Sequence, residues 1–384
     1  MSKAPAKDGS NFRARRLSVS DIDTSEFAAA GGSTPSGSKG KPKRRMSMSP
    51  EMGEKKAADA PFPLDIVGTF SCHGVEPGHK QGETMAKINQ DRGCMSYPFA
   101  CDDKDYKQTL FCVFDGHGAV GDKVSQFVSE KVNDHLEANL LGGMSEEEAL
   151  KKAYVDTDDE LKKEKTIDAE LSGTTAVSVL YRYYPASGKH ECWCSWAGDS
   201  RAVIACADPA NEGKILCMDL SDDHKPDTPK ESERIKRCGG FISPPEEEWG
   251  GPARVWLDPG MTLPGLAMAR SIGDHLVKPV GVVAEPEVKK WSYPPQAGDS
   301  YTLPGPPLFI TMASDGVWEF IESKKAIDLV QKFFNAKIDT NDNATTAVTK
   351  LIETSAAKWR HEEGDYRDDI TAIVFRVGKP LFPE

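Results

Sequence analysis

Four short segments of the chain place an aspartate where an apolar run begins or ends. An Asp-Gly pair after a strand is first of all a turn, because glycine reaches positive φ and aspartate bonds nearby amides. Aspartates gathered at the ends of a sheet have another use, since hard cations such as Mg²⁺ and Mn²⁺ take oxygen ligands. Each segment alone therefore predicts a turn, whereas the set predicts a divalent-cation site. The segments are Asn89-Gln90-Asp91, Asp115-Gly116-His117-Gly118, Ala313-Ser314-Asp315-Gly316 and Arg367-Asp368-Asp369-Ile370.

The elements that must position these aspartates alternate between strand and helix patterns. Residues 109–114 form a short apolar run, and residues 120–141 carry apolar side chains at helical spacing until a Gly-Gly pair stops the helix. Ser145 with Glu148 forms a capping box that opens a second helix, which runs to about residue 165. Runs of strands broken by pairs of helices predict an α+β fold rather than a strict βαβ repeat.

The chain from residue 61 continues this pattern with no sign of an internal domain boundary. Thr228 and Pro229 open a further helix, with proline at its favoured first position. The other predicted elements are strands at residues 174–184, 191–197, 201–207, 308–312 and 370–377, and helices at residues 323–335 and 345–362.

Residues 1–60 differ from the rest in composition. They are rich in Ser, Gly, Lys, Pro and Ala and poor in aromatic residues, so they cannot bury enough apolar surface to offset the entropy of ordering. We expect them to be disordered. Arginine pairs precede Ser18 and Ser47 and resemble sites of basophilic kinases, although a merely solubilising basic tail explains them as well. Residues 41–45 also resemble a short nuclear-localisation patch.

Charge and composition exclude several classes of protein. The chain carries a net charge of −12, of which residues 1–60 contribute +5 and the remainder −17. An acidic domain argues against nucleic-acid binding and is compatible with a cation site. No apolar stretch approaches the roughly 18 residues that span a bilayer, so we expect a soluble protein without a membrane segment.

The nine cysteines indicate a reducing compartment, because they include no CxxC pair and their number is odd. Cys192 and Cys194 lie two apart in a strand pattern, so they share one face and are expected to be core residues rather than metal ligands. We expect a cytoplasmic or nuclear protein, or one present in both compartments.

Three more segments complete a set of seven that resembles, in type and order, the motifs of the type 2C metal-dependent protein phosphatases. The resemblance covers residues 66–377, and residues 264–270 look especially like the plant and protist members. It implies a central pair of stacked antiparallel β-sheets with helices on both outer faces, a four-layer αββα fold. The added segments are Ser172-Gly173-Thr174-Thr175, Ala197-Gly198-Asp199-Ser200-Arg201 and Ala269-Arg270-Ser271-Ile272-Gly273-Asp274.

The resemblance implies direct ligands for two Mg²⁺ or Mn²⁺ ions. Asp115 matches the aspartate that bridges both ions, and the Gly116 carbonyl matches a ligand of the second. Asp315 and Asp368 match the remaining direct ligands of the first ion. Such a pair of ions activates water and neutralises charge on the phosphoryl oxygens during in-line attack.

Three other residues have implied roles around these ligands. Asp91 matches a carboxylate that holds metal-bound waters, and Asp199, together with Asp315, matches a weaker third metal site. His117 matches the proposed general acid, and a histidine beside a metal ligand is a suitable proton donor near pH 7. His224 and His275 lack such a setting and are expected to be structural.

The sequence departs from the family pattern in three places. Many relatives have a phosphate-gripping arginine where this chain has Ala86, and the adjacent Lys87 can bind phosphate only as a point charge. Gln90 stands where some members have a glutamate, and its carbonyl can still accept a hydrogen bond. Residues 243–262 lengthen one connection, either as a substrate-selecting flap or as a simple loop insertion.

These observations favour a monomeric protein serine/threonine phosphatase that acts on phosphoprotein substrates. A catalytically weak, phosphoprotein-binding regulatory module on the same fold is the main alternative. The presence of every direct-ligand aspartate argues against that alternative. In a third interpretation, the protein is chiefly an interaction platform through residues 1–60.

Overall fold

The computed structural model describes residues 62, 63, 65–79, 82–101, 105–245, 251–334 and 343–382, together with the backbone of Arg15–Ser18. Arg15–Ser18 form a strand instead of the predicted disorder, whereas the rest of residues 1–60, with the basic patch at residues 41–45 and the kinase site at Ser47, falls outside the described residues.

The first of two large sheets has eight strands, and all its pairings are antiparallel. Two very short strands, β7 (Gly173–Thr174) and β15 (Ile272–Gly273), extend the end of β6. The main path runs in the order β1 (Arg15–Ser18), β5 (Asp91–Tyr97), β6 (Lys107–His117), β8 (Ala176–Tyr184), β9 (Lys189–Ala197) and β16 (Glu287–Tyr293).

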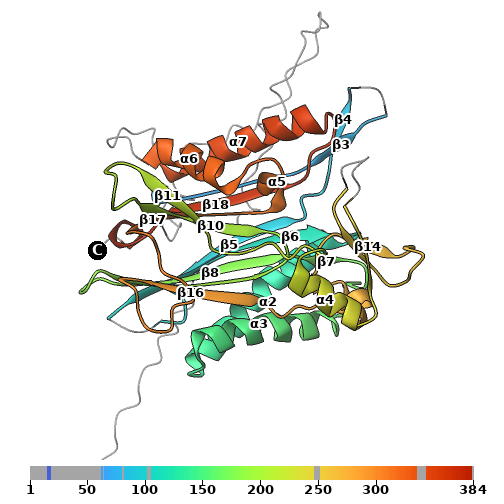
Figure 1. Cartoon of the computed structure of the whole chain (residues 1–384), viewed down its shortest axis with the longest axis horizontal. Coiled ribbons are helices and arrows are strands. Elements are labelled where there is room, and N and C mark those ends of the chain that lie inside the picture. The colour runs from blue at the N-terminus through green and yellow to red at the C-terminus, as the bar shows by residue number, and fades with distance from the viewer. Residues whose placement is uncertain are drawn as a thin grey trace, which may run out of the picture.

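The second sheet has five antiparallel strands and packs face to face with the first (Figure 1). Across the interface between the sheets, β18 contacts β5 and β6, and β17 contacts β6. Its order is β11 (Ile215–Asp219), β10 (Arg201–Ala207), β17 (Pro307–Ala313), β18 (Ile370–Arg376) and β2 (Val67–Cys72).

Helices cover both outer faces of this sandwich (Figure 1). The first sheet is covered by α2 (Gly121–Leu141) and α3 (Glu146–Leu161), and the second by α6 (Ser323–Phe334), α7 (Ala344–Glu362) and the short α5 (Asp315–Trp318). The predicted four-layer αββα arrangement is therefore confirmed. Within the described ranges, none of the helices combines the length and apolar composition that crossing a bilayer requires.

Three hydrophobic clusters correspond to the three interfaces between the four layers. Between the sheets, Phe111 of β6 stacks on Phe375 of β18 with ring centroids 3.9 Å apart. The same cluster contains Cys192 and Cys194, both fully buried and unbridged, so the prediction that they are core residues is confirmed. Burial of these apolar faces is the main force that holds the two sheets together.

A smaller unit lies at one end of the sandwich. It consists of α4 (Pro229–Arg237), the 3₁₀ helix η3 (His275–Val280) and a three-stranded sheet with its own hydrophobic cluster. The strands of that sheet are β12 (Phe241–Ser243), β13 (Arg254–Trp256) and β14 (Pro264–Leu266), so β13 and the end of β12 lie within the lengthened 243–262 connection. The hairpin of β3 (Val75–Pro77) and β4 (Thr84–Ala86) stands apart from it, and η4 (Lys379–Leu381) closes the described chain.

The structure corrects several local expectations. The second helix ends at Leu161 rather than near residue 165. The predicted capping box is wrong, because Ser145 Oγ donates to the Glu148 carboxylate at 2.6 Å and does not cap the backbone. Asp115 and Gly116 belong to β6 itself rather than to a turn, and the chain turns at Gly118, where φ is 86°.

Candidate metal centre

Two adjacent strands of the first sheet, β5 and β6, place two aspartates face to face. Asp91 opens β5 and pairs directly with Asp115, near the end of β6. Residues directly opposite each other in an antiparallel pair share one face, and like charges in such positions destabilise the sheet. Thr175 holds this end of β6 in place, because its hydroxyl accepts from the Asp115 N–H at 3.0 Å and its N–H donates to the Asp115 carbonyl at 2.9 Å.

The second sheet brings further carboxylates to the same end. Asp315 follows β17 and begins α5, directly after Ser314. The Ser314 hydroxyl donates to Asp91 Oδ2 at 2.7 Å and accepts from the Thr371 N–H of β18 at 3.0 Å. One buried serine thus ties the ends of β17 and β18 to the start of β5 in the opposing sheet.

Asp368 and Asp369 precede β18 and point to different partners. Asp369 accepts hydrogen bonds from the backbone N–H of Gly74 at 2.5 Å and of Gln90 at 2.8 Å, so it fixes the turn that leads into Asp91. Asp368 interacts electrostatically with Asp115 and Asp315, and therefore belongs to the same cluster.

The clustered carboxylates repel one another. Burial, and then the charges of Asp91, Asp315 and Asp368, raise the pKa of Asp115 well above its ordinary value. Burial, and then Asp199 and Asp368, raise the pKa of Asp315 to about 7. Burial is the largest cause of the raised pKa of Asp91 as well. Without a compensating cation, the carboxyl groups with raised pKa values take up protons more readily, because neighbouring like charges disfavour ionisation of the whole cluster.

The oxygen atoms at this position fit a divalent metal. Asp91 Oδ1 is buried and has no hydrogen-bond partner among the described residues. The backbone is tightly packed at Gly116, where a Cβ atom would lie 2.4 Å from the Gly121 carbonyl oxygen and 2.6 Å from that of Gln90. Clustered carboxylate and carbonyl oxygens are the donor set that Mg²⁺ and Mn²⁺ prefer.

Lys87 lies at the edge of this cluster. Its Nζ donates to Asp368 Oδ1 at 2.9 Å and to the Tyr366 hydroxyl at 3.3 Å, and it lies 5.1 Å from the centroid of the Tyr366 ring. Burial alone would lower the pKa of Lys87, but the Asp368 charge outweighs that effect and raises it. The structure thus gives Lys87 a carboxylate partner that the sequence did not predict.

His117 is held by a buried carboxylate from a distant segment. Its Nε2 lies 2.8 Å from Asp274 Oδ2, and the Ser271 hydroxyl donates to the same oxygen at 2.6 Å. Burial would lower the pKa of His117, yet the charge and hydrogen bond of Asp274 raise it. His117 Nδ1 is buried and has no hydrogen-bond partner within the described part of the chain.

The loop that carries Asp274 has little room for variation. Asp274 has a left-handed backbone with φ of 50°. A Cβ atom on Gly173 would lie 2.1 Å from its carboxylate and 2.9 Å from His117 Nε2. Asp158 of α3 accepts from the Gly273 N–H at 2.7 Å and so attaches this loop to α3.

Asp199 lies near the cluster but has a partner of its own. Lys225 Nζ donates to its Oδ2 at 2.5 Å, and Oδ1 is buried without a partner among the described residues. After burial, the charge of Asp199 is the next largest cause of the raised pKa of Asp315. It also raises the pKa of His117, although burial and Asp274 have larger effects there. The structure therefore brings every sequence-predicted site residue to one end of the sandwich.

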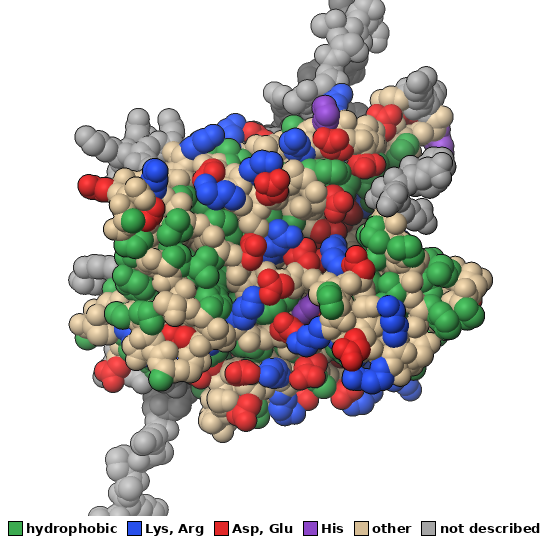
Figure 2. Space-filling view, in the orientation of Figure 1, with side chains coloured by type: hydrophobic (Ala, Val, Ile, Leu, Met, Phe, Trp, Pro, Cys, Tyr) green, Lys and Arg blue, Asp and Glu red, His purple; other side chains and the backbone are tan. Residues whose placement is uncertain are grey.

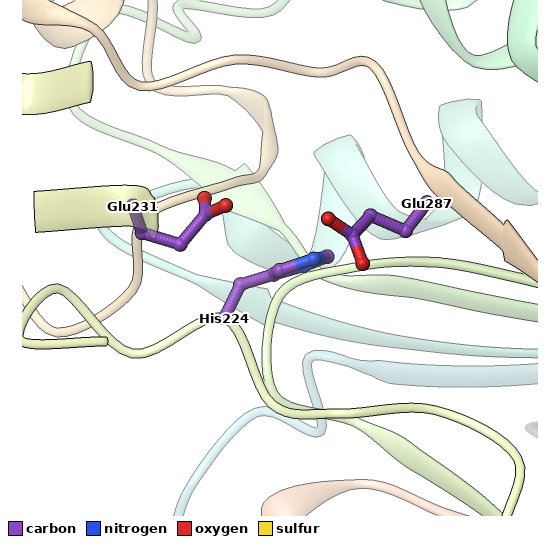
Figure 3. Close-up of side chains that lie close together, drawn as sticks. All are labelled: His224, Glu231 and Glu287. Carbon is purple, nitrogen blue, oxygen red and sulfur yellow. The ribbon is translucent and has the colours of Figure 1, made fainter. Parts of the chain in front are cut away.

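A second acidic cluster, formed by His224, Glu231 and Glu287, is suited to a different purpose (Figure 3). Arg270 donates to both oxygens of Glu231 at 2.6 and 2.9 Å and to Glu287 at 3.0 Å. Burial opposes ionisation of Glu231, but these bonds to Arg270 lower its pKa to about 2. Arg234 also pairs with Glu231 and Lys230 with Glu287, so cations of the chain already balance both carboxylates, and the cluster anchors the smaller unit to the sandwich rather than binding metal.

Four residues that hold the site residues in place were not assigned roles from the sequence. Ser314, Asp369 and Asp274 stood inside the recognised segments, and their roles depend on partners more than 150 positions away. Lys225 stood outside all seven segments. The neighbouring Asp-His pair was the only local signal for it.

Sequence comparison places the chain among known proteins. A family model described as "Protein phosphatase 2C" matches residues 77–362. The chain is 33% identical over 334 residues to "Probable protein phosphatase 2C 35" of Arabidopsis thaliana, with 82% of this chain and 84% of the relative covered. It is 32% identical over 297 residues to "Probable protein phosphatase 2C 64" of Oryza sativa subsp. japonica, with 75% and 62% covered.

Solved structures agree on the fold. The chain resembles "Crystal structure of serine-threonine phosphatase 2C from Toxoplasma gondii" with a TM-score of 0.61 and 21% identity, over 83% of this chain and 96% of that one. It also resembles "Structure of a C.elegans sex determining protein" with a TM-score of 0.58 and 19% identity, over 82% and 65%. The matched family model and the relatives above 30% identity show that the chain belongs to the protein phosphatase 2C family and is a protein serine/threonine phosphatase.

Proposed function

We propose that this phosphatase hydrolyses phosphoserine and phosphothreonine esters at a site for two Mg²⁺ or Mn²⁺ ions. The observation that supports this most directly is the convergence of four carboxylates from both sheets, with Asp91 directly opposite Asp115 and with Asp315 and Asp368 close to them. Ions bound there supply a nucleophilic water at neutral pH and neutralise charge on the phosphoryl oxygens.

The chain's own residues hold the oxygens in position. We assign Asp115 to both ions, the Gly116 carbonyl to the second, and Asp315 and Asp368 to the first. Asp91, which the Ser314 hydroxyl holds, is assigned to the water shell of the ions. The tight packing of β6 against Thr175 and of Asp369 against the Asp91 turn limits reorganisation when charge develops.

His117 is proposed as the general acid that protonates the leaving alkoxide. Asp274 accepts from its Nε2 and fixes the ring, which leaves Nδ1 to carry the transferred proton. A positioned carboxylate also stabilises the protonated imidazole, as a donor to an alkoxide requires.

The test is hydrolysis of a phosphoserine peptide by the full chain, with and without Mn²⁺. We expect turnover only with the metal, and a loss of about 100-fold or more in kcat for Asp115→Ala and for Asp315→Ala. Asp328→Ala, which removes an exposed aspartate of α6, serves as the control and is expected to keep full activity. Metal-independent turnover, or normal turnover by both site variants, contradicts the proposal. Peptide binding without turnover identifies the regulatory module instead.

Lys87 is proposed to bind the substrate phosphate as a point charge, next to the Asp368 carboxylate that it contacts. A charged contact of this kind contributes about 1.5–3 kcal/mol, so Lys87→Met is expected to raise KM by about tenfold or more. Lys87→Arg retains the charge and is expected to recover most of that loss. An unchanged KM for the peptide in Lys87→Met excludes the role.

The rim of the site has an apolar side on the smaller unit. Phe241, Met261 and Leu263 expose 37%, 42% and 53% of their surface, and Figure 2 shows hydrophobic side chains gathered at the edge that carries β14. This supports the interpretation of residues 243–262 as a substrate-selecting flap. Shortening this segment is expected to change the ranking of peptide substrates, whereas an unchanged ranking supports a simple loop insertion.

We propose that the catalytic domain spans residues 61–384 and acts as a monomer in the cytoplasm, the nucleus or both. Residues 1–60 are proposed as a regulatory tail that a basophilic kinase phosphorylates at Ser18 or Ser47. Mass spectrometry of the protein from cells tests the tail, and the absence of phosphate at both serines contradicts its role. Turnover by residues 61–384 alone tests the domain assignment.

A further inference from the structure

Asp199 is paired with a cation supplied by the chain itself. Lys225 Nζ donates to Asp199 Oδ2 at 2.5 Å, which is at the short end for a charge-assisted hydrogen bond. The Asp199 side chain is 3% exposed and that of Lys225 is 34% exposed, so the pair lies at the inner end of an opening to solvent. The charge of Asp199 is therefore already balanced in the protein alone.

The backbone fixes Lys225 beside Asp199. The preceding residue, His224, donates its N–H to the Gly198 carbonyl at 3.0 Å and accepts the Gly198 N–H at its Nδ1 at 3.2 Å. The His224 ring also stacks on Trp196 with centroids 5.7 Å apart and planes 12° apart. These contacts join the two segments on both sides of the ion pair, so Lys225 is not a freely moving surface lysine.

The network beneath His224 strengthens this attachment. Figure 3 shows the His224 ring between Glu231 and Glu287, whose carboxylates Arg270 bridges. Burial, and then the charge of Arg270, lower the pKa of His224 to about 3, so the ring keeps the neutral form in which Nδ1 can accept the Gly198 N–H. The position of the Lys225 ammonium is thus determined by a buried network rather than by the ion pair alone.

A divalent ion at Asp199 would have to bind beside this ammonium. Only Oδ1 of the carboxylate is without a partner among the described residues, and Oδ2 is taken by Lys225. Two cations a few ångströms apart repel strongly in a partly buried setting. Lys225 also acts electrostatically on Asp315, the other residue implied in a third metal site.

We infer that Lys225 is a built-in cation that supplies positive charge at Asp199 and keeps the affinity for a third divalent ion low. The inference rests on the proposed two-ion function and refines it. The resting site then holds two metal ions and one lysine ammonium.

The test is a titration of the metal-free full chain with Mn²⁺. The electron paramagnetic resonance signal of free Mn²⁺ measures how many ions bind and how tightly. We expect two tightly bound ions in the unsubstituted protein and in Lys225→Arg, which keeps the charge. Lys225→Met is expected to bind a third ion at least tenfold more tightly than the unsubstituted protein does. Adding Asp199→Asn to Lys225→Met is expected to remove that third ion.

Other outcomes distinguish this inference from the proposed function. Three equally tight ions in the unsubstituted protein, or an unchanged third ion in Lys225→Met, overturn the role of Lys225. Lys225→Gln gives the same measurement if the methionine variant does not fold. An unsubstituted protein that binds no Mn²⁺ tightly contradicts the two-ion proposal itself.

Discussion

The contact between His117 and Asp274 makes the acid role testable through the leaving group. When an alkyl phosphate is hydrolysed, the departing alkoxide needs a proton, whereas the aryloxide of an aryl phosphate departs readily without one. We therefore expect His117→Ala to slow hydrolysis of a phosphoserine peptide by about 100-fold and that of an aryl phosphate far less. Asp274→Asn should show the same pattern more weakly, because it removes the negative charge that raises the pKa of His117 but keeps an oxygen that can accept from Nε2.

Parallel kinetics on the two substrates measure this difference. Asp168→Asn is a suitable control, since Asp168 is exposed and its carboxylate accepts from the nearby Glu170 N–H at 3.2 Å. Equal losses on both substrates would show that His117 and Asp274 support the site without donating a proton. Unchanged turnover of the phosphoserine peptide in Asp274→Asn would show that His117 donates the proton without help from Asp274.

Individual residues show where sequence reasoning is sufficient and where it is not. Asp115 and Asp315 were predictable because each lies in a short motif directly after an apolar strand. The partner of His117 was not, because a hydrogen bond between positions 117 and 274 depends on three strand ends meeting. Lys87 was predicted to bind substrate phosphate as a point charge, and its bond to Asp368 arises only because β3 of the β3–β4 hairpin bridges to Arg367, just before Asp368.

Among the secondary-structure elements, β1 links the tail to the catalytic sheet. Arg15–Ser18 pairs antiparallel with Cys94–Tyr97 at the edge of β5, and Ser18 is one of the two predicted phosphorylation sites. An unpaired edge strand exposes backbone groups to solvent. We expect Leu17→Pro, which removes a donor and fixes φ, to speed amide exchange of residues 94–97 in the full chain. Hydrogen exchange with mass spectrometry measures this.

The control for β1 is Ala29→Pro, which changes the tail outside the paired segment. Residues 192–196 in the middle of β9 should exchange at the same slow rate in every variant. Exchange of residues 94–97 that Leu17→Pro leaves unaltered would show that β1 does not protect the edge of β5. In that case Ser18 would be accessible to a kinase without any strand release.

The pairing of β8 and β9 ends at a histidine that must stay neutral. The Tyr181 hydroxyl accepts the Gly378 N–H at 2.7 Å and lies within hydrogen-bond distance of His190 Nδ1, at 2.6 Å. Burial lowers the pKa of His190 to about 4 from an ordinary 6.5. The unfolded chain therefore binds a proton first as pH falls, so the folded state loses stability between pH 6.5 and 4.

After discounting for its partial exposure, His190 should account for about 1–2 kcal/mol of that loss. Urea unfolding at pH 7 and pH 4.5 measures it against His190→Gln, which does not titrate. We expect the difference in unfolding free energy between the two proteins to narrow toward pH 4.5. A constant difference at both pH values would mean that His190 is protonated in neither state or in both.

Elements and their order were more predictable than their partners. The long helices and the buried strands carry strong periodic patterns, and α6, α7 and β18 lie within two residues of their predicted bounds. The predictions passed over β11, β16 and the three-stranded sheet, because these strands are short or half-buried and have no clean alternation. The neighbouring strands with which they pair, such as β10 for β11 and β9 for β16, determine their position more than their own sequence does.

The molecule as a whole is strained where it is expected to act, and metal should relieve that strain. Asp91, Asp115, Asp315 and Asp368 hold like charges together at the junction of both sheets, so the metal-free fold carries their mutual repulsion. A ligand that binds only the folded state at 100 times its Kd stabilises that state by about 2.7 kcal/mol. For a domain of this size, Mn²⁺ should raise the Tm by about 5 °C or more.

Thermal unfolding with Mn²⁺ and with a chelator separates repulsion from metal binding. In the chelator, Asp115→Asn should unfold at a higher temperature than the unsubstituted protein, because one of the opposing charges is gone. With Mn²⁺ the order should reverse, since the variant lacks the carboxylate placed between the two ions. Asp328→Asn on α6 should follow the unsubstituted protein in both conditions. If Asp115→Asn is less stable without metal, Asp115 stabilises the junction of the two sheets by its own hydrogen bonds, and the cluster is not strained.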